Sequence, residues 1–192
     1  QKRGSLLWVL DKTHTAMGAR LLRTWLEQPL IDRNEILNRQ QAVEELNLNY
    51  IGREELGEYL NPIYDLERLI GRISYKTANP RDLLAFSNSI AMIPHIKKLL
   101  GEFTCENLKY LQEELDPLEE LCEEIRRGIV EEPPVSIREG GIIRDGYNEE
   151  ADRLRHAKTE EKTWLAQLET RDREKTENKN LKIKYNKVFG YY

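Results

Sequence analysis

The stretch EEADRLRHAKTEEKTWLAQLETRDREK, residues 149–175, decides the fold class. It predicts one long helix, and at about 1.5 Å per residue this helix would be about 40 Å long. Its apolar positions are sparse: Ala151, Leu154, Ala157, Trp164, Leu165 and Leu168. A helix inside a bundle needs a wider apolar face, whereas this narrow row suits one partner helix with solvent elsewhere. We therefore expect the helix to project as an arm from a globular body.

The body before this arm is predicted to be helical. Thr13 or Thr15 can cap a first helix, which Pro29 would end. Asp32-Arg33-Asn34-Glu35 has the pattern of a capping box and opens a second helix. Helical spacing predicts that this second helix turns the following residues inward: Ile36, Val43, Leu46 and Tyr50.

Later in the body, proline and leucine positions indicate further helices. Asn79-Pro80 marks another helix start, and Pro94 should kink that helix by removing one hydrogen bond. Apolar residues then recur at separations of 3 and 4, which is typical of a helix packed on another helix. Asp116-Pro117 interrupts this row, either as a kink or as a stop and restart. The row comprises Leu108, Leu111, Leu115, Leu118, Cys122, Ile125 and Ile129.

The chain divides into four predicted segments. A helical core covers 1–130, a connecting loop or short hairpin covers 131–146, a lever-like helix covers 147–176, and a last segment covers 177–192. In that last segment Leu181, Ile183 and Tyr185 alternate with polar residues, which predicts a strand of a short β-hairpin. The predicted fold is therefore mainly α. Because the chain starts on Gln1 and stops inside a predicted strand, we expect it to be an excerpt of a longer protein.

Composition excludes several classes of protein. The chain has 192 residues, of which 33% are charged and 8% aromatic, which fits a surface-rich helical protein rather than a membrane protein. It contains no secretory signal, and Cys105 and Cys122 lack metal-site spacing, so we expect reduced thiols and a cytoplasmic location. Charge is uneven, with eleven acidic and three basic residues over 102–132 but seven basic and three acidic over 171–192. The end of the chain is thus the part that suits a polyanion.

No catalytic or metal-binding pattern stands out. His14, His95 and His156 have no metal-ligand spacing and are interpreted as surface or packing residues. The acidic run 113–124 is interpreted as a solvated face, and Gly140-Gly141 fits no nucleotide-binding loop. Lysines 182, 184 and 187, interleaved with aromatic residues, either contact DNA phosphates or protect an exposed strand edge, and composition favours neither.

Three segments together resemble a known family. GSLLWVLDKTHTAMGARLLRTWLEQPL (4–30) is similar to the opening of the core domain of the MutS family of bacterial DNA mismatch repair proteins. IREGGIIRDGYNEEADRLR (137–155) resembles the approach to that family's lever helix, although Ala151 stands where the family usually has Leu. REKTENKNLKIKYNKVFGYY (173–192) resembles the entry into its clamp domain.

The resemblance implies a mechanical role. The parent protein would be a dimeric ATPase that binds mismatched double-stranded DNA and recruits a MutL-type factor, in the cytoplasm and on the nucleoid. ATP and Mg²⁺ would belong to the parent, with no cofactor, no metal and no enzymatic activity in this segment. The clamp entry implies Lys184, Asn186 and Lys187 as residues that contact the DNA backbone. The alternative is a stand-alone helical scaffold that presents a coiled-coil arm to a protein partner.

Overall fold

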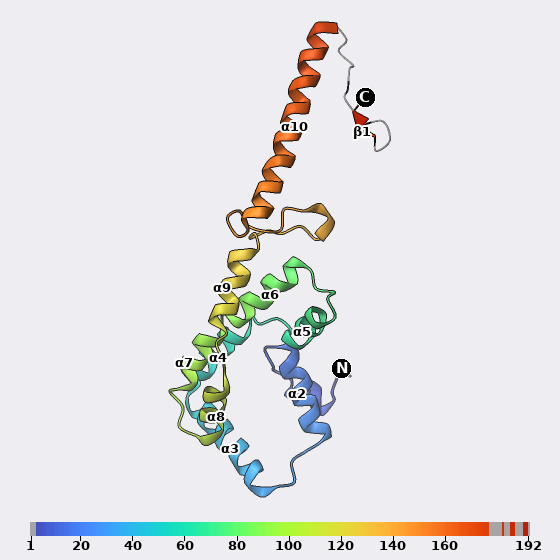
Figure 1. Cartoon of the computed structure of the whole chain (residues 1–192). Coiled ribbons are helices and arrows are strands. Elements are labelled where there is room, and N and C mark those ends of the chain that lie inside the picture. The colour runs from blue at the N-terminus through green and yellow to red at the C-terminus, as the bar shows by residue number, and fades with distance from the viewer. Residues whose placement is uncertain (1–2, 177–181, 183–184, 187–189, 192) are drawn as a thin grey trace. The chain divides into compact units, whose positions relative to one another are not determined.

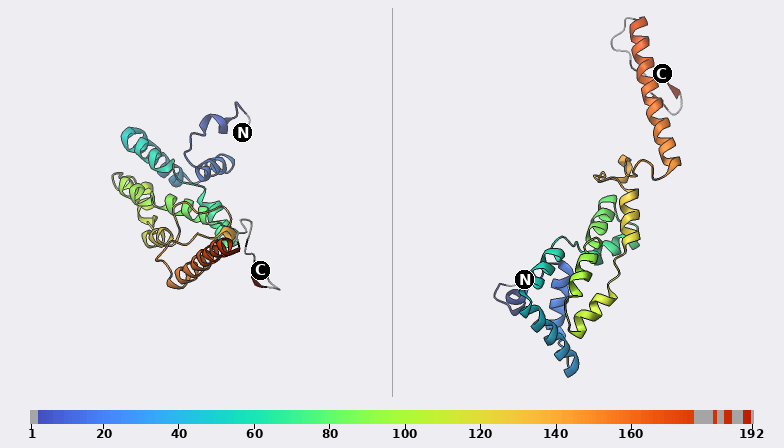
Figure 2. Two further views of the ribbon diagram at one scale, coloured as in Figure 1. Left: turned by 90° about the horizontal axis from the view of Figure 1, so that it is seen from above. Right: turned by 90° about the vertical axis from the view of Figure 1, so that its left-hand side faces the viewer.

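The computed structural model describes residues 3–176, 182, 185–186 and 190–191 (Figures 1 and 2). The chain forms two compact units, residues 1–142 and residues 143–192. Helices dominate the described part of both units, so the predicted mainly α fold is confirmed.

Unit 1 is built from short helices that pack on one another. Within the described residues, α6 packs against α5 and α9, α7 against α4 and α8, and α3 against α4 and α8. Views from two directions show α6 and α9 side by side (Figures 1 and 2). The bounds are α1 (Leu6–Leu10), α2 (Ala16–Glu27), α3 (Arg33–Leu48), α4 (Tyr50–Leu60), α5 (Leu66–Ser74), α6 (Pro80–Ile90), α7 (Ile93–Leu100), α8 (Glu106–Glu114) and α9 (Glu119–Gly128).

The predicted helix starts are largely confirmed. Thr15 caps α2 by accepting a hydrogen bond from the Gly18 N–H. Asp32 caps α3 by accepting from the N–H groups of Asn34 and Glu35, which is the Asp32 half of the expected capping box. Asn79 caps α6 in a full capping box with Asp82. These starts are set by side chains close in sequence, which is why the sequence predicts them.

Two proline positions behave differently from each other. The kink predicted at Pro94 is wrong: α6 ends at Ile90, and Pro94 lies in the first turn of a separate helix, α7. Proline is tolerated there because the first-turn N–H groups have no partner within the helix. At Asp116-Pro117 the structure shows the stop and restart, since α8 ends at Glu114 and α9 begins at Glu119.

The core of unit 1 consists of two hydrophobic clusters. One gathers around α7 and α8 and comprises Ala42, Ile96, Leu99, Leu100, Phe103 and Leu108. The other gathers around α6 and comprises Leu69, Phe86, Ile90 and Cys122. The expectation that Val43 and Tyr50 face inward is wrong, because both are exposed and α3 instead buries Ala42.

The rest of the described chain consists of a loop at the end of unit 1 and the helix and strands of unit 2. In residues 131–142 of unit 1 the structure has a loop with one 3-10 turn, η1 (Ile137–Glu139), and the Val130 N–H donates to the Ile142 carbonyl. Unit 2 contains α10 (Glu149–Thr176), close to the predicted 149–175. It also contains strands β1 (Tyr185–Asn186) and β2 (Gly190–Tyr191), which pair antiparallel.

Candidate functional site: the long helix and the terminal strand pair

Of the three predicted DNA-contact residues, the structure describes Asn186. Asn186 lies in β1 opposite Gly190 of β2, and Tyr185 pairs with Tyr191. Lys184 and Lys187 lie outside the described residues. Lys182 is exposed to solvent. Both interpretations of the lysines, phosphate contact and edge protection, therefore stay predictions.

The start of α10 is fixed by its own lead-in loop. Asn148 Oδ1 accepts a hydrogen bond from the Ala151 N–H at 2.9 Å, and the Asn148 carbonyl accepts from the Asp152 N–H at 3.0 Å. One turn further on, Asp152 Oδ2 accepts from the Gly146 N–H at 2.8 Å. Gly146 has a φ of 82°, a left-handed conformation that favours glycine. The first turn of α10 is thereby closed by polar groups of residues 146–148.

Arg155 joins the second turn of α10 to the same loop. Its guanidinium donates to the Ile143 carbonyl at 2.8 Å and to Asp152 at 3.2 Å, and it forms an ion pair with Asp145. A guanidinium has five donors in a rigid fork, so one side chain can hold three acceptors at once. Sequence reasoning missed this role of Arg155, although the Asp152–Arg155 spacing of three residues was a usable signal.

The apolar row of α10 is largely open in unit 2. Leu154 and Trp164 are exposed, whereas Leu165 and Leu168 are partly buried. On another face, the hydroxyls of Thr159, Thr163 and Thr170 donate to backbone carbonyls four residues earlier at 2.9 Å. Such bonds satisfy the hydroxyls within the helix.

The histidines and acidic residues are dispersed. The His14 Nδ1 lies 2.8 Å from Asn61 Oδ1, and the His95 ring stacks on Tyr59 with centroids 5.3 Å apart. Within the described part of the chain, no three His, Cys, Asp or Glu side chains gather closely enough to hold a metal ion. Both cysteines are free thiols. In the same part of the chain, none of the helices combines the length and apolarity that a bilayer crossing requires.

Comparison with known proteins gives a consistent result. The family model of MutS domain III matches residues 1–183. The DNA mismatch repair protein MutS of Lachnoclostridium phytofermentans is 63% identical over 194 residues, covering 100% of this chain and 21% of the relative. The proteins of the same name from Ruminiclostridium cellulolyticum and Listeria monocytogenes serovar 1/2a are 54% and 50% identical, each over 191 residues, with 100% of this chain and 22% of the relative covered.

The match extends over nearly the whole chain, so it includes α10 and its fixed start as well as unit 1. The chain spans about a fifth of the length of these relatives. On this match and these identities, the chain belongs to the MutS family and corresponds to its domain III.

Proposed function

We propose that this chain is the core and lever segment of a MutS-type mismatch repair protein, in which it links an ATPase region to a clamp on DNA. The observation that carries the proposal is α10, a helix of 28 residues whose first two turns are bound to the preceding loop by Asn148, Asp152 and Arg155. A helix fixed at one end can carry a small rotation of its base into a larger displacement at its other end. Family membership favours this role over the stand-alone scaffold.

The same proposal assigns some functions to the parent protein and others to this segment. Relatives of this chain are named DNA mismatch repair proteins. We infer that the parent protein binds mismatched double-stranded DNA, pairs with a second MutS copy and engages a MutL-type factor, in the cytoplasm and at the nucleoid. ATP and Mg²⁺ would be held outside residues 1–192. The segment itself would catalyse no reaction, because its role is to position the clamp.

The contact with DNA is proposed to be non-specific and electrostatic. Lysines near a strand pair suit phosphate oxygens, and such contacts fix the position of a protein on a duplex without reading sequence. Residues 171–192 carry seven basic and three acidic side chains, which supports attraction of a polyanion at this end. We assign the backbone contacts to Lys184, Asn186 and Lys187.

A salt titration tests the assignment. Binding of the chain to a short fluorescent duplex is measured by anisotropy at several salt concentrations, for the wild type and for Lys184→Ala, Lys187→Ala and Asn186→Ala. The plot of log K against log salt has a negative slope. Replacing a lysine that contacts a phosphate should make this slope less steep by about 0.9. Asn186→Ala should weaken binding without changing the slope, because its amide is neutral.

The control is Lys98→Ala, which removes an exposed lysine of α7 in unit 1 and leaves residues 177–192 unchanged. It should bind DNA like the wild type. Equal slopes and affinities for the control and both lysine variants would remove the clamp-entry lysines from the DNA contact.

A further inference from the structure

Residues 5–28, which contain α1 and α2, are attached to the rest of unit 1 in an unusual way. α2 has no buried residue, and its apolar side chains Leu21, Trp25 and Leu26 are 51%, 41% and 36% exposed. Met17 and Leu22 are partly buried, but neither they nor any other partly buried apolar side chain of residues 5–28 packs against either hydrophobic cluster. Burial of apolar surface is the usual force that holds a helix to its domain. Something other than a shared core therefore holds this segment.

One attachment point is His14, in the turn before α2. Its ring Nδ1 lies 2.8 Å from the Asn61 side-chain oxygen, just after the end of α4. The ring also lies against Gly57 of α4, where a Cβ would come within 2.9 Å of it. This close approach depends on glycine at position 57.

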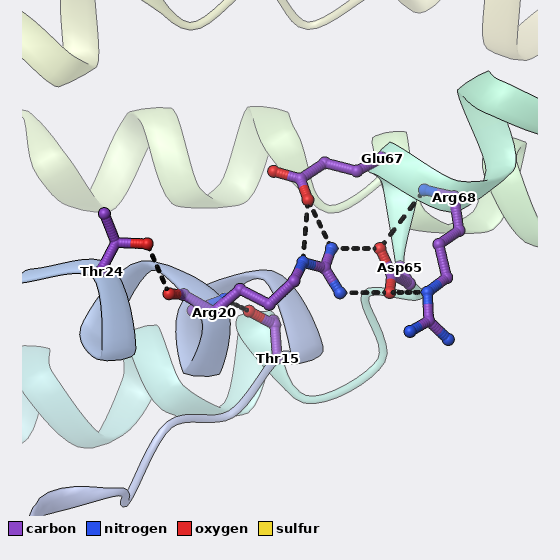
Figure 3. Close-up of polar contacts among 7 residues, drawn as sticks. Thr15, Arg20, Thr24, Asp65, Glu67 and Arg68 are labelled. Carbon is purple, nitrogen blue, oxygen red and sulfur yellow. Dashed lines mark hydrogen bonds and ion pairs between the residues drawn. The ribbon is translucent and has the colours of Figure 1, made fainter. Parts of the chain in front are cut away.

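The second attachment point is Arg20, in the middle of α2 (Figure 3). Its two terminal nitrogens donate to the two oxygens of Asp65 at 2.7 Å each, in a bidentate pair. The same guanidinium donates to Glu67 Oε2 through Nε at 3.0 Å and through a terminal nitrogen at 2.5 Å. Asp65 is the N-cap of α5, and its side chain is only 17% exposed. Arg20 thus connects α2 to the start of α5 through four charge-assisted hydrogen bonds.

The electrostatics of this cluster agree with its geometry. The Arg20 guanidinium, hydrogen-bonded to Asp65, holds the pKa of that carboxyl below its usual range, against the opposing effect of burial. The pKa of Arg20 is raised in turn, first by its hydrogen bonds to Asp65 and then by those to Glu67. Both ions are therefore stabilised in their charged forms.

The third attachment point is Trp25, near the end of α2. The Arg39 guanidinium of α3 lies 3.8 Å from the centroid of its ring, a cation–π contact. Next to this contact is an open groove of about 840 Å³, whose lining includes Trp25, Arg39, Val43, Leu46 and Arg53. The side chains of α2 therefore do not fill the space beside α3.

From these three attachments we propose that residues 5–28 form a flap, here called the α1–α2 flap, which docks on the α4–α5 junction and is released by salt. Arg20 is its clasp. The loop 28–32, between α2 and α3, is where the chain bends when the flap moves, and Ile31 in that loop is 95% exposed. Screening acts on ion pairs at the surface and leaves the two apolar clusters intact. Ionic strength thus controls the flap separately from the fold of unit 1.

Release should be visible as loss of helix in α2. This helix has 12 residues, and an isolated helix of this length is marginal in water. While docked it is held at His14, Arg20 and Trp25, so its amides exchange slowly. Once undocked it frays, and its amides exchange with solvent.

Hydrogen exchange on the full chain tests the proposal. Raising salt from about 0.1 M to about 1 M shortens the Debye length from about 10 Å to about 3 Å, and exchange in residues 16–27 should accelerate while exchange in α6 does not. Arg20→Ala should accelerate exchange in α2 by about tenfold at low salt, the loss expected for a partly exposed charge-assisted contact. The variant should then show little further response to salt.

Arg23→Ala is the matched control. Arg23 lies on the same helix and pairs with Glu27 one turn away at 2.8 Å, so its removal leaves the contact with α5 in place. Arg20→Lys, which keeps the charge but loses the bidentate fork, should fall between the two. Salt-independent exchange in α2 of the wild type would overturn the proposal. So would equal exchange in the Arg20→Ala and Arg23→Ala variants, or parallel acceleration in α2 and α6.

Discussion

Glu45 caps a helix to which it does not belong, and its replacement gives a sharp test of the fold. α8 begins at Glu106, and the side chain of its N-cap residue, Cys105, accepts no capping bond. Glu45 of α3 supplies the acceptors instead. Its Oε1 accepts from the Thr104 N–H at 2.6 Å and from the Thr104 hydroxyl at 2.8 Å, and its Oε2 accepts from the Cys105 N–H at 2.7 Å.

The size of the effect follows from these bonds. In Glu45→Gln one oxygen remains as an acceptor, but an amide NH₂ replaces the other and faces a backbone N–H that it cannot bond. A hydrogen bond to a charged group is worth about 1.5–3 kcal/mol, and the charge also favours the N-terminus of a helix. Because Glu45 is partly open to solvent, we expect a loss of about 2 kcal/mol in the free energy of unfolding at neutral pH.

The loss should depend on pH. Burial acts to raise the pKa of Glu45, but the N–H groups of Cys105 and Thr104 outweigh it and lower the pKa from 4.5 to about 2. A carboxyl whose pKa is lower in the folded state stabilises the fold above its unfolded pKa and loses this contribution as pH falls. The difference between the wild type and Glu45→Gln should therefore be constant above about pH 5 and shrink between 4.5 and about 2.

Urea unfolding followed by far-UV circular dichroism measures the difference, and hydrogen exchange in the first turn of α8 locates it. Glu44→Gln is the matched control. Glu44 is the exposed neighbour on α3, and its side chain forms no hydrogen bond or ion pair among the described residues. A Glu45→Gln variant as stable as Glu44→Gln, or a stability difference that persists unchanged down to pH 2, would refute the cap.

Two further substitutions test local geometry by the same unfolding assay. Gly57→Ala should raise the free energy of unfolding by about 0.5–1 kcal/mol only in a His14→Ala background, because the new Cβ would meet the His14 ring at 2.9 Å in the wild type. An equal effect in both backgrounds would show that the His14 ring does not restrict position 57. Lys76 follows the C-cap of α5 with a φ of 56°, so Lys76→Gly should stabilise by about 1 kcal/mol. Lys76→Ala keeps the Cβ and should gain nothing; if alanine stabilised as much as glycine, backbone strain would not be the cause.

Features set by neighbouring residues could be predicted from the sequence. The caps at Thr15, Asp32 and Asn79 depend on groups within three positions, and the long helix 149–176 was predicted almost to its last residue. Pro94 was misjudged because a proline that kinks one helix and a proline that opens the next give the same local signal. The outcome depended on whether α6 continued past Ile90.

Features set by distant contacts could not be predicted. Spacing placed Val43 on an apolar face, but packing against α8 selected the neighbouring face, where Ala42 lies. The spacing of the apolar row 108–129 predicted one continuous contact between two helices. In the structure its halves join different clusters, with Leu108 in one and Cys122 in the other.

The site shows the same limit. Glu45 reaches a partner 60 positions away, so no local pattern indicated its role. Arg155 reaches the Ile143 carbonyl 12 positions away, and its spacing of three residues from Asp152 was the one local signal for its role. The clamp-entry residues Lys184, Asn186 and Lys187 were chosen by resemblance alone, and their contact with DNA stays a prediction.

The junction of α6 and α7 has a consequence for how unit 1 melts. Met92, just before α7, packs against the α7–α8 cluster, whereas Ile93, the first residue of α7, packs against the α6 cluster. Two adjacent residues therefore send their side chains into different cores, and neither core can come apart without disturbing the backbone that both share. Despite its divided interior, the part of unit 1 that contains the two clusters, without the α1–α2 flap, should lose its structure in a single cooperative transition.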